Sequence, residues 1–145
     1  MFTGGGAIYV NYFNSYAPVV MWFVIRLLII IAVVLLWELR LLDFVLAYTQ
    51  APIKCDVYLK IPDSVEMDQG SNKPHILKLL KNIYGQKKAG RVWNDYLTGK
   101  LLKLGFRRSL VDECVFYRNS LVFLVYVGDG IFVPLDGSKI DDAIK

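Results

Sequence analysis

Cysteine and histidine are scarce in this chain of 145 residues, which has two cysteines, Cys55 and Cys114, and one histidine, His75. The cysteines lack the Cys-x-x-Cys or Cys/His spacing of a zinc site, so the sequence predicts none. Residues 1–16 do not resemble a secretion signal. Two isolated cysteines therefore favour reduced, buried thiols over a disulfide. A lone histidine after a proline is more typical of a loop than of a catalytic site.

Charged residues are also sparse, at 21% of the chain, whereas 55% is hydrophobic and 14% aromatic. This apolar share and the length predict one domain with a substantial core. The net charge of +4 agrees with an anionic partner such as nucleic acid. Many proteins without such a partner carry as much charge, so the charge alone does not assign a function.

One long apolar run, residues 17–37, has a single charged residue, Arg26. A bilayer span needs roughly 20 apolar residues, and the basic residues that follow the run would leave the C-terminal part in the cytoplasm. However, Arg26 near the bilayer centre would cost about 2.5–3.5 kcal/mol, and Pro18 suits the first turn of a helix in a globular domain. We therefore predict a buried helix here. The alternative is a small single-pass membrane protein anchored by residues 17–37.

Local patterns predict the remaining elements. Strands are expected in the first part of 37–48, at 56–61, at 75–80 and at 114–118, with a loop at 62–74 and the start of a helix at 139–145. A helix is expected over about 91–104, ended by Gly105. The residues expected on its apolar face are Val92, Tyr96, Leu97, Leu101 and Leu104.

The segment 121–133 has apolar residues on both sides of Gly128-Asp129-Gly130 and predicts a buried β-hairpin with one carboxylate at its tip. Such a carboxylate is either an ordinary turn residue or a metal ligand. Asp43 raises the same question because it interrupts another apolar run. It either caps a following turn or has a metal or other partner that offsets the cost of its burial.

Four sequence blocks follow one another along the chain. They are Tyr16-Ala-Pro-Val-Val20, Leu42-Asp43-Phe-Val-Leu-Ala47-Tyr48, the segment from Leu80 to Trp93, and Tyr126-Val127-Gly128-Asp129. In this order the blocks resemble the reverse transcriptase domain of copia-type retrotransposons, whose fourth block reads Tyr-Val-Asp-Asp. The resemblance predicts a partial reverse transcriptase domain over residues 9–145, after a Gly-rich N-terminal extension over residues 1–8.

The resemblance implies an α/β (α+β) fold, the reverse transcriptase palm with part of the fingers. In this fold a mixed or antiparallel sheet packs on helices, and here it would be truncated at both ends. The implied activity is RNA-directed DNA polymerisation, a nucleotidyl transfer assisted by two Mg²⁺ ions. Mg²⁺ prefers oxygen ligands such as carboxylates. The implied partners are an RNA or DNA template–primer and a deoxynucleoside triphosphate, in the cytoplasm or nucleus.

The resemblance also implies roles for individual residues. Asp43 and Asp129 match two of the family's three metal-binding, catalytic carboxylates. Tyr48 matches the ring that lies beneath the incoming sugar and excludes a 2′-hydroxyl. The other residues that match the nucleotide pocket are Tyr84, Gly85, Lys87 and Arg91. The two basic residues would lie near phosphates, although a basic helix start exposed to water is equally typical of such a pattern.

Gly128 departs from the family pattern because it replaces the first aspartate of Tyr-Val-Asp-Asp. Glycine has no ligand atom, so the loss should lower two-metal activity by orders of magnitude. The turn should survive, since glycine tolerates a positive φ at a hairpin tip. We therefore expect a catalytically inactive fragment, with a non-catalytic nucleic-acid-binding module as a further alternative. Gly90 in place of proline and Gln86 in place of leucine are milder departures.

Overall fold

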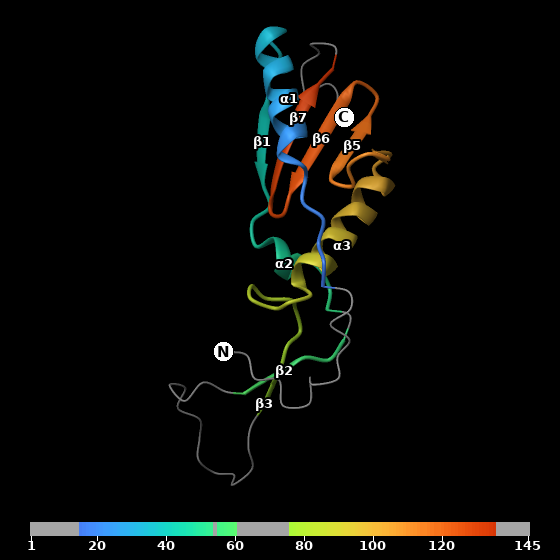
Figure 1. Cartoon of the computed structure of the whole chain (residues 1–145). Helices are drawn as coiled ribbons and strands as arrows, with labels where there is room; N and C mark the ends of the chain where they lie inside the picture. The colour runs from blue at the N-terminus through green and yellow to red at the C-terminus, as the bar shows by residue number, and fades with distance from the viewer. Residues whose placement is uncertain (1–14, 54, 61–75, 136–145) are drawn as a thin grey trace.

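A five-stranded antiparallel sheet is the larger of two sheets in the computed structural model, which describes residues 15–53, 55–60 and 76–135 (Figure 1). The strand order is β1-β7-β6-β5-β4. The strands are β1 (Arg40–Asp43), β4 (Arg107–Arg108), β5 (Val115–Arg118), β6 (Leu121–Tyr126) and β7 (Asp129–Pro134). With the helices described below, this sheet confirms the predicted α+β class.

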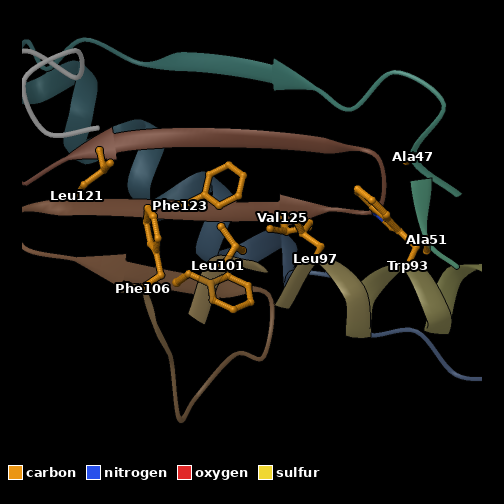
Figure 2. Close-up of a cluster of buried hydrophobic side chains, with 10 residues drawn as sticks. Ala47, Ala51, Trp93, Leu97, Leu101, Phe106, Leu121, Phe123 and Val125 are labelled. Atoms are coloured by element: carbon orange, nitrogen blue, oxygen red, sulfur yellow. The ribbon is translucent and has the colours of Figure 1, made fainter. Parts of the chain in front are cut away.

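Side chains of the central strand β6 alternate between two cores on opposite faces of the sheet. Leu121, Phe123 and Val125 belong to the cluster that contains Leu97 and Leu101 of α3 (Ala89–Lys103), shown in Figure 2. Val122 and Leu124 belong to the cluster that contains Ile25 and Ala32 of α1 (Trp22–Val34). Because helices cover both faces, the strand is apolar at every position rather than at alternate ones.

The structure corrects the prediction for the long apolar run. Its helix, α1, begins at Trp22 rather than near Pro18, and in its 13 residues only Ile25 and Ala32 are buried. Its outer face is exposed, with Phe23 at 72% and Ile30 at 60% of full exposure. The helix covers one face of the sheet, so contact with the strands buries a single stripe. Within the described ranges, no helix combines the length and apolar character needed to cross a bilayer.

Asp112, which lies before β5, fixes the entry to α1. One carboxylate oxygen, Oδ2, accepts a hydrogen bond from the backbone N–H of Met21 over 2.9 Å, and Oδ1 accepts one from Cys114 over 2.9 Å. Asp112 is only 6% exposed. A buried carboxylate is tolerated here because both of its oxygens are hydrogen-bonded. This contact joins two segments 91 positions apart in the chain.

Two short strands, β2 (Tyr58–Lys60) and β3 (Ile76–Lys78), pair in a separate antiparallel sheet. They confirm the strands predicted at 56–61 and 75–80, although both are shorter than expected. An ion pair of 2.8 Å between Lys78 Nζ and Asp56 Oδ1 lies beside this pairing. The predicted loop at 62–74, the predicted helix at 139–145 and the N-terminal extension lie outside the described residues.

Helix α3 confirms the predicted helix, with a start two residues earlier and Gly105 just beyond its end at a φ of 85°. The predicted apolar face needs correction, because Leu97 and Leu101 are buried but Leu104 is 60% exposed. Leu104 is the C-cap residue, where the helix ends. Trp93 is buried in the same cluster as Leu97 and was missing from the predicted face.

Cys114 and Cys55 are both free thiols, as predicted, but their burial differs. Cys114 is fully buried, whereas Cys55 is exposed, which corrects the prediction of two buried thiols. Burial raises the pKa of the Cys114 thiol from 9.0 to about 11, and the nearby Asp112 carboxylate adds to the rise. Cys114 therefore stays protonated at neutral pH and acts as a small apolar group in the core.

Candidate functional site

The two predicted carboxylates lie directly opposite each other on neighbouring strands. The β1–β7 register pairs Asp43 with Asp129, the last residue of one strand with the first residue of the other. Residues paired in this way point to the same face of an antiparallel sheet, with Cβ atoms about 4.5–5.5 Å apart. Both residues are exposed. The chain thus presents two carboxylates side by side at one end of the sheet.

The face on which the carboxylates lie follows from the next strand. Tyr126 of β6 is paired with Asp129, so its side chain shares that face. The Tyr126 ring contacts the ring of Trp22 at the start of α1, with centroids 5.9 Å apart. Asp43 and Asp129 therefore project on the α1 side of the sheet, away from the α3 side.

The hairpin tip consists of Val127 and Gly128 between β6 and β7. The positive φ expected at Gly128 lies instead at Val127, whose φ is 56°. A positive φ at the first turn residue alone is the pattern of a type II′ turn. A Cβ built on Gly128 would meet Ala47 Cβ at 3.7 Å, an ordinary contact distance. The fold therefore leaves room for a side chain at position 128, and it does not require glycine there.

Tyr48 and Tyr84, both assigned to the nucleotide pocket by resemblance, lie together. Their ring centroids are 4.5 Å apart, although the residues are far apart in the sequence. Tyr48 belongs to the short helix α2 (Ala47–Gln50), which follows β1. Gly85 has a φ of 89°, a backbone conformation that favours glycine. The structure therefore brings three of the five residues predicted for the nucleotide pocket into one place.

The two predicted basic residues lie around the start of α3. Lys87 is exposed and lies just before the helix. Arg91 lies in the first turn, where its Nε atom pairs with the Asp95 carboxylate over 3.1 Å. Its Nη1 group donates a hydrogen bond to the backbone oxygen of Tyr16 over 3.4 Å. The Arg91 guanidinium is thus directed by contacts within the chain.

Two residues that the sequence analysis did not assign to the site hold the hairpin tip. The indole Nε1–H of Trp93 donates a hydrogen bond to the Val127 carbonyl oxygen over 2.6 Å. The backbone N–H of Phe44 donates to the Gly128 carbonyl oxygen over 2.8 Å. Trp93 closes the third sequence block and Phe44 follows Asp43 in the second. The sequence signal for Trp93 and Phe44 was their position within blocks that resemble the family.

The side chains at this site meet only part of the requirements for binding a divalent metal ion. Asp43 and Asp129 supply carboxylate oxygens on one face, as a hard cation requires. No group of three or more acidic, histidine or cysteine side chains that could hold a metal occurs among the described residues. A pair of ions bridged by a shared carboxylate needs a further ligand, and position 128 is glycine. The residues present therefore fit a single weakly held cation, and they do not fit a two-ion centre.

A sheet with paired aspartates beside its hairpin tip and helices on both faces agrees with the α+β polymerase fold implied by the resemblance. Comparison with known families agrees. Residues 7–145 match the family described as "Reverse transcriptase (RNA-dependent DNA polymerase)". The chain belongs to this family, and its relatives are copia-type and related retrotransposon polyproteins.

Among these relatives, the retrovirus-related Pol polyprotein from transposon RE1 of Arabidopsis thaliana is 32% identical over 92% of the chain and 9% of the polyprotein. That from transposon RE2 of the same plant is 33% identical over 82% of the chain and 8% of the polyprotein. That from transposon TNT 1-94 of Nicotiana tabacum is 26% identical over 90% of the chain and 10% of the polyprotein. The chain thus spans about a tenth of the length of these relatives. No solved structure matches it significantly.

Proposed function

We propose that this chain is the palm region, with part of the fingers, of a copia-type reverse transcriptase, and that its metal site keeps two of three carboxylates and no longer supports DNA synthesis. The observation that carries the proposal is the register that places Asp43 opposite Asp129. Gly128 stands in the turn beside them, where the family has its first aspartate. We place the domain at residues 9–145 and the N-terminal extension at residues 1–8.

Asp43 and Asp129 would hold a Mg²⁺ ion through their carboxylate oxygens. In the family, divalent ions lower the pKa of the primer hydroxyl and stabilise the departing pyrophosphate. The residues of this chain would bind one ion and orient a nucleotide, but they lack the carboxylate that would bridge two ions. For this reason we assign the chain no nucleotidyl-transfer step. Loss of one member of a catalytic set commonly removes most of the activity of the set.

The proposed nucleotide pocket consists of the Tyr48–Tyr84 pair, Gly85, Lys87 and Arg91. The two tyrosine rings, in contact and tilted by 46° to each other, would offer an aromatic surface to a sugar or base. Lys87 and Arg91 add positive charge around the start of α3, a few residues after Tyr84 in the sequence. A template–primer and a deoxynucleoside triphosphate are therefore the partners that we propose. Residual binding without catalysis would make the chain a nucleic-acid-binding module with the same fold.

Titration with Mn²⁺, followed by the electron paramagnetic resonance signal of the free ion, tests the proposed metal site. We expect the chain to bind Mn²⁺ weakly, with a Kd on the order of 10⁻³ M. Asp43→Asn or Asp129→Asn should abolish this binding, because either change leaves one carboxylate.

Asp56→Asn is the matched control, since Asp56 is an exposed aspartate paired with Lys78 beside the other sheet. Its substitution should leave Mn²⁺ binding unchanged. Equal binding by the unaltered chain and by both Asp43→Asn and Asp129→Asn would show that the metal is held elsewhere, and the proposed site would then be wrong.

A further inference from the structure

The hairpin tip has a backbone conformation that its sequence does not favour. Val127 has a φ of 56°, a region that β-branched side chains rarely adopt. In a type II′ turn the first central residue is usually glycine, whereas here the glycine, Gly128, comes second. Contacts from outside the hairpin are therefore needed to keep this turn in shape.

Two hydrogen bonds from different elements supply this restraint. Trp93 of α3 donates its indole N–H to the Val127 carbonyl oxygen over 2.6 Å. Phe44, which follows β1, donates its backbone N–H to the Gly128 carbonyl oxygen over 2.8 Å. The rings of Trp93 and Phe44 pack edge to face with centroids 5.2 Å apart, so the two residues that donate these hydrogen bonds also contact each other. Trp93 is 2% exposed, which shields its hydrogen bond from water.

These two bonds adjoin the carboxylate pair along the chain. Phe44 comes directly after Asp43, and Gly128 comes directly before Asp129. The position of the tip therefore decides how the Asp129 side chain stands relative to the Asp43 side chain across the β1–β7 register.

We propose that Trp93 is a positioning residue for the metal site. Its indole N–H locks the turn at Val127, and the locked turn sets the separation and direction of Asp43 and Asp129. Trp93 acts through the turn and does not itself bind metal or nucleotide. This role rests on the proposed function, because it presumes that the two aspartates bind a cation.

The hydrogen bond can be detected directly by nuclear magnetic resonance on the unaltered protein. With ¹⁵N and ¹³C labelling, we expect a through-hydrogen-bond scalar coupling between Nε1 of Trp93 and the carbonyl carbon of Val127. Trp22, which is 63% exposed, is the internal reference for an indole in contact with water. Its N–H should exchange with solvent at least about 100-fold faster than that of Trp93. Absence of the coupling, together with equal exchange rates, would overturn the proposal.

The positioning role is tested by Trp93→Phe, which keeps an aromatic ring and removes the N–H. The change is made in the Gly128→Asp variant, whose third carboxylate gives a stronger binding signal. We expect Trp93→Phe to lower the Mn²⁺ affinity of that variant about tenfold. Trp37→Phe is the matched control, since Trp37 packs against the core on the α1 side. It should leave the affinity within about twofold.

A second variant separates the hydrogen bond from packing. Replacing Trp93 with β-(3-benzothienyl)alanine keeps the ring shape and puts sulfur in place of the N–H, so it tests the bond even if Trp93→Phe does not fold. A loss of Mn²⁺ affinity in this folded variant supports the positioning role. Unchanged affinity overturns that role while leaving the metal site intact. No Mn²⁺ binding by the Gly128→Asp parent would instead overturn the proposed function and the positioning role with it.

Discussion

Gly128→Asp is expected to tighten Mn²⁺ binding by one to two orders of magnitude, because a third carboxylate joins Asp43 and Asp129 at the hairpin tip. The backbone accepts the change. Gly128 has no positive φ, and a Cβ at this position meets Ala47 at an ordinary distance of 3.7 Å. The added carboxylate would stand next to two others, which costs repulsion in the absence of metal. Metal binding relieves this repulsion. We therefore expect tighter Mn²⁺ binding but no increase in the free energy of unfolding of the metal-free protein.

The same Mn²⁺ titration checks this prediction. Gly128→Asn is the matched control, because it adds a side chain of similar size without a charge. It should bind Mn²⁺ far more weakly than Gly128→Asp. If Gly128→Asp and Gly128→Asn bound Mn²⁺ equally, position 128 would not adjoin the metal, and the assignment of the missing ligand would be contradicted.

Phe123→Ala should have the largest effect on stability. The ring is 1% exposed and stacks on Phe132 with centroids 4.2 Å apart. It also contacts the rings of Phe44 and Phe106. The ring also lies against Gly130, where a Cβ would collide with it. Truncation of a buried phenylalanine costs about 3–5 kcal/mol through lost burial and the cavity left behind.

Urea denaturation followed by circular dichroism measures this loss as a change in the free energy of unfolding. A typical domain has about 5–15 kcal/mol of stability in total, so the variant should be close to unfolding. Leu110→Ala is the control, because Leu110 is fully exposed at 101% and should change stability by less than about 0.5 kcal/mol. A loss below about 1 kcal/mol for Phe123→Ala would show that this cluster is not the core.

The sequence predicted the central hairpin well because local signals specify it. An apolar run on each side of a Gly/Asp turn indicates two buried strands, and β6 and β7 confirm them. The strand that ends at Asp43 and the helix that begins near Arg91 were predicted by the same local reasoning. The side-by-side placement of Asp43 and Asp129 came from the family resemblance, since strand pairing is not encoded in any local pattern.

Features that depend on tertiary contacts were predicted less well. The apolar composition of α1 suggested burial on all sides, but the helix covers one face of the sheet and leaves Phe23 and Val34 exposed. The positive φ at Val127 could not be predicted, because glycine is the usual choice for it and Gly128 lies next to it. The Val127 carbonyl oxygen accepts a hydrogen bond from Trp93, a tertiary contact that no local sequence pattern encodes. The exposure of Cys55 likewise depends on what packs around it.

A primer-extension assay on the purified chain, with Mg²⁺ and separately with Mn²⁺, tests the central claim most directly. A labelled DNA primer on an RNA template, together with all four deoxynucleoside triphosphates, would be incubated with the unaltered protein and with Asp43→Asn. We expect no extended product from either protein with either metal, because the carboxylate that joins the two ions is replaced by Gly128. Extension by the unaltered protein that Asp43→Asn abolishes would show an active polymerase and contradict this account.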